Sequence, residues 1–135
     1  MFSDEDRKKC DELYNRYYRG RKFHDSLYRE MIHKHLRAGQ RVLDAGCGRY
    51  LTFCKNLTPA AWVVGIDMEP ALETTNQSSP FGIRGNLDTL PFADASFDMI
   101  ISRSVVEHLA DPPRVFREFA RVLRPGGKVV IITPN

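Results

Sequence analysis

Two carboxylates and a glycine turn are the residues of this sequence whose types and spacing could do chemistry. Asp44 follows an apolar run and precedes a Gly-x-Gly turn at residues 46–48, and a second apolar run ends in Asp67. Glycines let the backbone turn sharply and let a ligand approach the main-chain N–H groups. A carboxylate at the end of the following strand can bind both hydroxyls of a ribose. These residues therefore predict a pocket for a cofactor that contains adenosine.

The turn departs from the dinucleotide fingerprint G-x-G-x-x-G, because Leu51 stands where its last glycine should be. That fingerprint seats a pyrophosphate at a helix N-terminus. Asp44, two residues before the first glycine, would repel a pyrophosphate but suits a ligand that carries positive charge. A sulfonium group together with an amino-acid ammonium group fits this electrostatic environment. A nucleotide-binding oxidoreductase domain remains an alternative, which Leu51 argues against.

Four segments of the sequence resemble the class I S-adenosylmethionine-dependent methyltransferases. The glycine turn is similar to their first motif, D-x-G-x-G-x-G, with Tyr50 in place of the third glycine. Residues 85–92 are similar to the family's G-D-A-E-x-L-P-F loop, with Asn86 in place of the usual aspartate. Residues 97–98 are similar to the F-D start of the fourth strand, and residues 123–127 to the L-x-P-G-G signature before the fifth. Among the subfamilies, the small-molecule enzymes of the ubiquinone/menaquinone-biosynthesis type are the nearest.

The resemblance implies an enzyme that transfers the methyl group of S-adenosylmethionine to an O, N or C atom of a small molecule. It implies that Asp67 binds the ribose, that Asn86 lies at the adenine, and that the glycine turn seats the methionine end. The implied cofactor-binding residues are Asp44, Gly46, Cys47, Gly48, Asp67, Met68, Asn86, Leu87, Ser102 and Arg103. We expect Cys47 to be a small filler rather than a nucleophile, because no partner that would lower its pKa is evident. A catalytically incompetent cofactor-binding or regulatory module is the alternative, favoured by Tyr50 and the short length.

Glu107 and His108 follow the predicted fourth strand, where an acceptor could approach, and are the candidate catalytic residues. A histidine at such a place can act as a general base near neutral pH. However, the sulfonium methyl group is already activated, so aligning the reacting atoms and excluding water can supply much of the barrier reduction. We therefore favour a packing or helix-terminus role for the pair. No metal site is predicted, since no acidic residue stands at metal-ligand spacing from the N-terminal histidines, His24, His33 and His35.

Hydrophobic periodicity predicts an α/β fold. We expect strands at residues 41–45, 62–66, 81–84, 97–102 and 128–133, and a helix at residues 112–123 with a buried stripe of Val115, Phe116, Phe119, Ala120 and Leu123. Several strands are apolar at consecutive positions, as in parallel sheets that helices cover on both faces. This pattern indicates a doubly wound, Rossmann-like, mostly parallel sheet, for which the resemblance implies the strand order 3-2-1-4-5. The ligand is expected beyond the carboxyl ends of the strands, beside the first.

Two helices are expected within residues 1–39. The first has apolar residues at helical spacing that would form a buried face: Cys10, Leu13, Tyr14, Tyr17 and Tyr18. The second has a similar face, made of Tyr28, Met31, Ile32, His35 and Leu36, and Gly39 ends it. We treat residues 1–135 as a single methyltransferase-like domain, in which residues 40–135 form the cofactor-binding α/β core.

The composition is that of an ordinary globular protein. The 135 residues are 42% hydrophobic and 27% charged, and the formal net charge of +3 is spread along the chain, so no nucleic-acid partner is indicated. The three cysteines form no C-x-x-C pair, which indicates a reducing compartment. An acidic start and the lack of a long apolar run predict neither a signal peptide nor a membrane span, and hence a cytoplasmic location.

Residues 128–133 would form an edge strand that is apolar on both faces, because the two further strands of the resembled fold have no counterpart after them. Natural edge strands are usually protected by charge, proline or a covering segment, and only Lys128 and Pro134 offer such protection here. We therefore expect a fragment or truncated product of this fold, or burial of the edge by a partner chain or by self-association.

Overall fold

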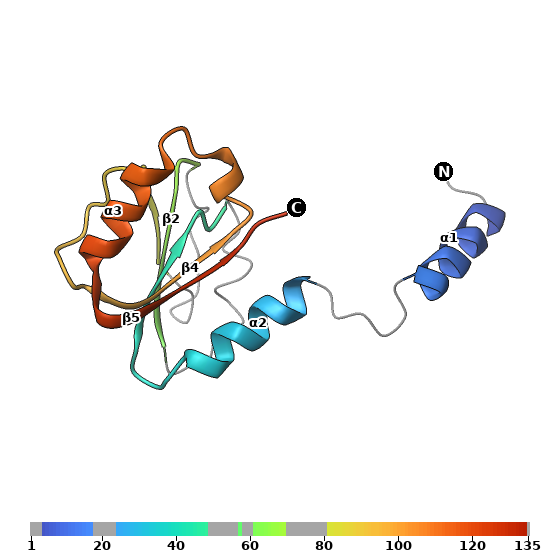
Figure 1. Cartoon of the computed structure of the whole chain (residues 1–135), viewed down its shortest axis with the longest axis horizontal. Helices are drawn as coiled ribbons and strands as arrows, with labels where there is room; N and C mark the ends of the chain where they lie inside the picture. Colours follow the sequence, from blue (N-terminus) through green and yellow to red (C-terminus); the bar gives the residue numbers. More distant parts are fainter. Residues whose placement is uncertain (1–3, 18–23, 49–56, 58–60, 70–80, 135) are drawn as a thin grey trace.

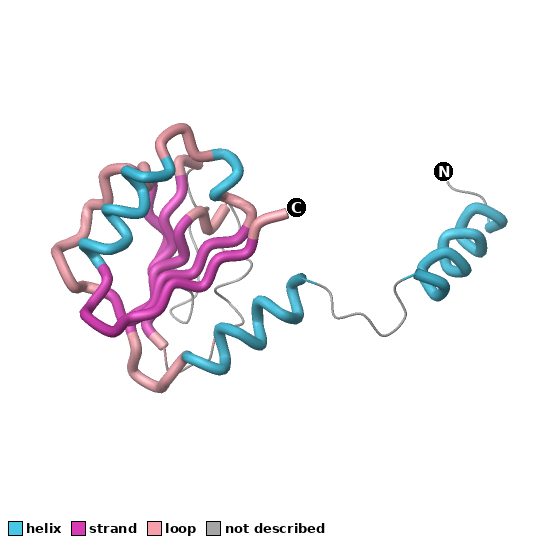
Figure 2. The backbone as a smooth tube through the Cα atoms, in the orientation of Figure 1, coloured by secondary structure: helices cyan, strands magenta, loops and turns pink. Residues whose placement is uncertain are grey.

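Five parallel strands form one sheet in the order β3-β2-β1-β4-β5. The computed structural model describes residues 4–17, 24–48, 57, 61–69 and 81–134. The strands are β1 (Arg41–Ala45), β2 (Trp62–Asp67), β3 (Phe81–Arg84), β4 (Phe97–Arg103) and β5 (Leu123–Ile132). Figure 2 shows them side by side in magenta. The predicted fold class and strand order are confirmed.

Helices pack on both faces of this sheet, α2 (His24–His35) on one and α3 (Pro112–Val122) on the other (Figure 1). Neighbouring residues of a strand point to opposite faces, so Val42 packs with α2 and Leu43 with α3. The α2 side of the core holds Tyr28, Ile32, Leu36, Val42, Leu57, Met99, Ile101 and Val130. The α3 side holds Leu43, Ala45, Ile66, Leu87, Leu90, Phe97, Ile100, Val115, Phe119 and Val122. Burial on both faces explains why the strands are apolar at consecutive positions.

The first helix, α1 (Asp4–Tyr17), differs from the prediction. It lies apart from the sheet (Figure 1), and its expected buried face is exposed: Leu13, Tyr14 and Tyr17 are each close to half exposed. Cys10 is exposed as well, and Tyr18 lies outside the described residues. Helical spacing identified the helix correctly but not what it packs against, because periodicity marks a face and not its partner. The predicted face of the second helix is buried at Tyr28, Ile32 and Leu36, whereas Met31 is exposed.

The segment that contains α3 begins with Asp111, whose carboxylate accepts a hydrogen bond from the backbone N–H of Arg114 at 3.1 Å. Two prolines follow in the first turn, where their missing N–H groups cost nothing. The helix buries Val115, Phe119 and Val122 and leaves Phe116 and Ala120 exposed. The predicted stripe was therefore correct at its centre and wrong at these two positions.

The strand β5 starts at Leu123, five residues before the predicted start. Leu123 pairs with Phe97, the register then shifts, and Lys128 pairs with Met99. Gly126 has a φ of +79°, and a Cβ at Gly127 would lie 2.7 Å from Cγ of Leu123. The Pro-Gly-Gly segment is thus an irregularity inside the β4–β5 pair, which only glycines permit. Within the described sheet β5 is an edge strand, and Val129 on it is 42% exposed.

Candidate functional site

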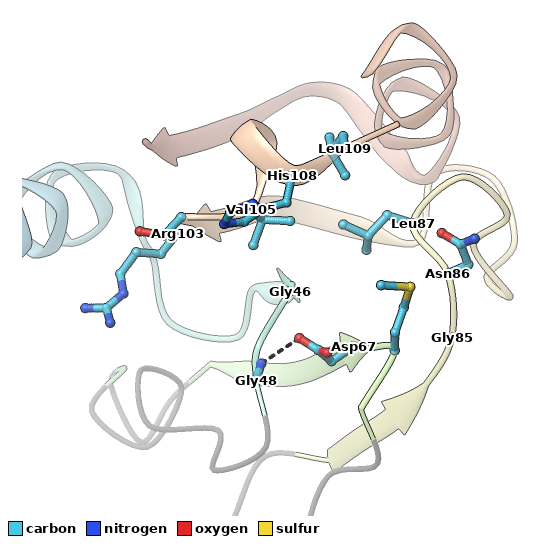
Figure 3. Close-up of a pocket in the computed structure, with 12 residues that line it drawn as sticks. Gly46, Gly48, Asp67, Gly85, Asn86, Leu87, Arg103, Val105, His108 and Leu109 are labelled. Atoms are coloured by element: carbon cyan, nitrogen blue, oxygen red, sulfur yellow. Dashed lines mark hydrogen bonds between the residues drawn. The ribbon is translucent and has the colours of Figure 1, made fainter. Parts of the chain in front are cut away.

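A cavity of about 350 Å³ opens at the carboxyl ends of the central strands (Figure 3). Its walls come from the turn after β1, the end of β2, the loop after β3 and the segment after β4. The lining residues are Gly46, Gly48, Asp67, Met68, Gly85, Asn86, Leu87, Arg103, Ser104, Val105, His108 and Leu109. The cavity lies at the switch point of the doubly wound sheet, where the strand order reverses between β1 and β4, and such folds bind ligands at this point.

The glycine turn is fixed between β2 and the segment after β4. The backbone N–H of Gly46 donates to the carbonyl oxygen of Ile66 at 2.8 Å, and Gly46 has a φ of +82°. A Cβ at this position would collide with Cγ2 of Val105, so no other residue fits without movement. Gly48 has a φ of +67°, but a Cβ there would meet no atom within 4 Å. Gly48 thus leaves open space beside the cavity, where a ligand can approach the backbone.

Asp67 is oriented by the backbone on both sides. Its Oδ2 accepts a hydrogen bond from the N–H of Gly48 at 2.8 Å, and its Oδ1 accepts one from the N–H of Glu69 at 3.0 Å. Figure 3 shows the bond to Gly48 as a dashed line. An ionised carboxylate has about four lone-pair sites, so these two bonds hold the group in place and leave acceptor capacity for hydroxyl groups.

The loop after β3 forms the opposite end of the cavity. The N–H of Gly85 donates to the carbonyl oxygen of Asp67 at 2.9 Å, and a Cβ at Gly85 would lie 2.7 Å from Cδ1 of Ile66. Asn86 is exposed with its side chain at the cavity, while Leu87 is buried in the core. The loop therefore presents one polar and one apolar side chain, a pair that suits the edge and the face of a flat heterocycle.

A cluster of charged groups attaches the rest of this loop to α3. Glu118 accepts hydrogen bonds from the N–H of Leu90 and from the guanidinium of Arg121, each at 2.7 Å. Arg121 also donates to the carbonyl oxygens of Leu90 at 3.0 Å and Phe92 at 2.7 Å. The hydrogen bonds from Arg121 are the main reason that the pKa of Glu118 falls from 4.5 to about 2. The loop that carries Asn86 and Leu87 is thus fixed on its far side.

The segment after β4 closes the cavity. Ser104 has a φ of +54°, and its N–H donates to the carbonyl oxygen of Ile132 at 2.8 Å, which ties this segment to the end of β5. His108 lies in the short 3-10 helix η2 (Val106–His108) and lines the cavity. Glu107 does not line it, because its Oε2 accepts a hydrogen bond from Oγ1 of Thr133 at 2.8 Å. The two candidate catalytic residues therefore have different roles: His108 can reach a ligand, and Glu107 supports η2.

Three of the predicted cofactor-binding residues are not on the cavity wall. Asp44 is 3% exposed, and Ser102 is 1% exposed with its hydroxyl donating to the carbonyl oxygen of Ala45 at 2.8 Å. Burial, with the nearby charges of Asp44 and Asp67, raises the pKa of the Cys47 thiol to about 12. A thiolate nucleophile at Cys47 is thereby disfavoured, as expected of a filler residue. Tyr50 and Leu51 lie outside the described residues.

The other predicted residues do line the cavity: Gly46, Gly48, Asp67, Met68, Asn86, Leu87 and Arg103. The lining residues that were not predicted are Gly85, Ser104, Val105 and Leu109. Gly85 could have been found, because it opens the loop that the motif comparison identified. Val105 and Leu109 could not, because an aliphatic residue after a strand carries no chemical signal of its own.

Comparison with protein-family models shows which family the chain belongs to. The model for a methyltransferase domain matches residues 43–131, from β1 to β5. The chain belongs to this methyltransferase family. The glycine turn, Asp67 and the loop after β3 all lie within the matched residues of the methyltransferase domain.

Individual relatives agree with this result. A probable S-adenosylmethionine-dependent methyltransferase of Mycolicibacterium smegmatis is 37% identical over 115 residues, which cover 83% of this chain and 44% of that protein. The malonyl-[acyl-carrier protein] O-methyltransferase of Erwinia pyrifoliae is 36% identical over 109 residues, with coverages of 77% and 42%. The solved structure of an S-adenosylmethionine-dependent methyltransferase from Mesorhizobium loti superposes with a TM-score of 0.67 at 28% identity, covering 80% of this chain and 51% of that one. The chain thus spans less than half the length of these two curated relatives.

Two further findings concern the parts of the methyltransferase domain that the structure describes. The described residues contain no group of three or more histidine, cysteine, aspartate or glutamate side chains that could hold a metal ion. None of their helices is long and apolar enough to cross a membrane.

Proposed function

We propose that the cavity binds S-adenosylmethionine and that the chain supports transfer of its methyl group to an O, N or C atom of a small molecule. The observation that carries this proposal is the bond between Asp67 and Gly48, which orients a carboxylate at the end of β2 beside an open glycine turn. Asp67 would hold the ribose hydroxyls, and Asn86 and Leu87 would hold the adenine. The methionine end would lie along the glycine turn.

The residues fit such a ligand in shape as well as in charge. The missing Cβ at Gly48 leaves space at the cavity, and the acidic side chains Asp44 and Asp67 suit a cationic sulfonium. The bound cofactor supplies an activated methyl group, so this chain needs to align the reacting atoms and keep water out. Val105 and Leu109 provide apolar wall for that purpose, and His108 can orient an acceptor without removing its proton.

One relative is named as a malonyl-[acyl-carrier protein] O-methyltransferase, which supports an oxygen acceptor within the proposed class. The exposed edge of β5 supports a partner chain, or self-association, that covers this strand. Family membership decides against the oxidoreductase alternative. The binding-module alternative predicts cofactor binding without turnover, and measuring both separates it from the enzyme.

Thermal unfolding with and without S-adenosylhomocysteine tests the proposal. A ligand at 100 times its dissociation constant should stabilise the folded chain by about 2.7 kcal/mol. NADH at the same concentration is the control and should leave the unfolding temperature unchanged. Stabilisation by NADH but not by S-adenosylhomocysteine would contradict the proposal.

A further inference from the structure

Arg103 is the one lysine or arginine among the described residues that line the cavity. It is the last residue of β4, and its side chain extends from the cavity rim toward α2 (Figure 3). There Nη1 donates to both carboxylate oxygens of Asp25, at 2.9 Å and 2.8 Å. Asp25 lies in the first turn of α2, so this ion pair joins α2 to the cavity rim.

The pair is open to solvent and exchangeable. The side chains of Arg103 and Asp25 are 45% and 60% exposed. Exposed ion pairs of this kind contribute about 1 kcal/mol or less, because water competes for both partners. A guanidinium carries five N–H donors, so a second carboxylate near Arg103 could share it with Asp25 or replace Asp25.

The arrangement along the cavity indicates where that second carboxylate would come from. Figure 3 shows Asn86 at one end, Asp67 and Gly46 in the middle and Arg103 at the other end. A ligand with its adenine at Asn86 and its ribose at Asp67 must extend its remaining part past Gly46, toward Arg103. In S-adenosylmethionine that part is an amino acid, which ends in a carboxylate.

We propose that Arg103 binds the carboxylate of the cofactor's amino-acid group, and that Asp25 is an internal competitor that holds Arg103 when no ligand is bound. The inference rests on the proposed function and adds to it the group that Arg103 binds and the exchange with Asp25. Binding of the carboxylate would release Asp25 and thereby loosen the link between α2 and the cavity rim. Ligand binding at Arg103 would then also change how α2 is held at the cavity rim.

Two ligands and two variants test this inference by calorimetric titration of the whole chain. S-adenosylhomocysteine carries the carboxylate, and 5′-methylthioadenosine lacks the whole amino-acid group. Arg103→Met should weaken S-adenosylhomocysteine binding about five- to tenfold, the scale of a charge-assisted hydrogen bond at an exposed site, and leave methylthioadenosine binding unchanged. Asp25→Asn should tighten S-adenosylhomocysteine binding roughly two- to fivefold, because it removes the competitor.

Opposite changes in S-adenosylhomocysteine affinity for the two variants would exclude a merely structural role for the ion pair. If the pair only holds α2 in place, both variants break it and must shift the affinity in the same direction, which would overturn the inference. An unchanged affinity of Arg103→Met for S-adenosylhomocysteine would overturn it too. Arg124→Met is the matched control, since Arg124 forms an equally short ion pair with Asp98 away from the cavity. If the unaltered chain binds neither nucleoside, the proposed function fails together with the inference; if it binds both equally, only the inference fails.

Discussion

The backbone N–H of Gly48 donates a 2.8 Å hydrogen bond to Oδ2 of Asp67, and this bond joins the turn after β1 to the end of β2. Gly48 follows β1 and Asp67 ends β2, and the carboxyl ends of these neighbouring parallel strands meet at the same edge of the sheet. The bond fixes the carboxylate beside Gly48, where a Cβ would meet no atom within 4 Å and a ligand has room.

Replacing Asp67 tests the proposed ribose contact. Asp67→Ala should weaken S-adenosylhomocysteine binding by about 1.5–3 kcal/mol, the scale of charge-assisted hydrogen bonds that the variant cannot make. Isothermal titration measures the loss. Asp67→Asn keeps one acceptor oxygen and should lose less. Equal affinities of the unaltered chain and of a folded Asp67→Ala variant would remove the ribose role.

The two turn glycines should respond differently to alanine. Gly46→Ala meets both a positive φ and the side chain of Val105, so it should lower the free energy of unfolding by about 2 kcal/mol or more. Gly48→Ala meets only the positive φ and should cost about 1–2 kcal/mol, but its methyl group intrudes on the ligand's space. Denaturant titration and ligand titration separate the two effects. A Val105→Ala change should partly restore Gly46→Ala; if it does not, the contact is not the cause.

Glu118 should make stability depend on acid pH. Its pKa is about 2 in the folded chain against 4.5 ordinarily, so the unfolded chain takes up the proton first as the pH falls. The stabilisation is present above about pH 4.5 and is lost progressively between pH 4.5 and about 2. Glu118→Gln should remove about 1–2 kcal/mol at pH 7 and flatten this part of the profile. Asp94→Asn is the control, because it leaves the bond between Glu118 and Arg121 in place. An unchanged slope in Glu118→Gln would contradict the assignment.

His108→Ala should leave cofactor binding intact and reduce turnover less than about 10²-fold, since alignment rather than proton removal is expected to carry the reaction. The measurement is methyl transfer across a panel of small hydroxyl, amine and carbon acceptors, together with titration of S-adenosylhomocysteine. A larger loss with unchanged binding would identify His108 as a general base.

The edge of β5 should promote association. Val129 is 42% exposed on this edge strand, and Val129→Lys places a charge there, which should lower self-association in light scattering. Phe116→Lys is the matched control, because Phe116 is 41% exposed on α3, away from the edge. If only Phe116→Lys reduces association, α3 and not β5 is the contact surface.

The sequence predicted the parts of the site whose chemistry shows in the residue type. Asp67, the turn glycines and Asn86 could be placed at one sheet edge, because each follows an apolar strand in a parallel fold. Asp98, at the start of β4, has a structural role instead, because its carboxylate accepts hydrogen bonds from the N–H of Arg41 and the guanidinium of Arg124, each at 2.8 Å.

Other features depend on three-dimensional packing and could not be predicted. The fit of Val105 against Gly46 depends on the path of the segment after β4. The exposure of the apolar face of α1 depends on whether another segment covers it. The early start of β5 depends on glycines that a sequence pattern marks as a turn, although they also serve as an irregularity within paired strands.

A crystal structure of the chain with S-adenosylhomocysteine is the decisive test of whether Asp67 binds the ribose. We expect the ribose hydroxyls to lie within hydrogen-bond distance of Asp67, with the adenine beside Asn86 and Leu87. A nucleoside bound elsewhere, or bound in the cavity with its ribose away from Asp67, would contradict it.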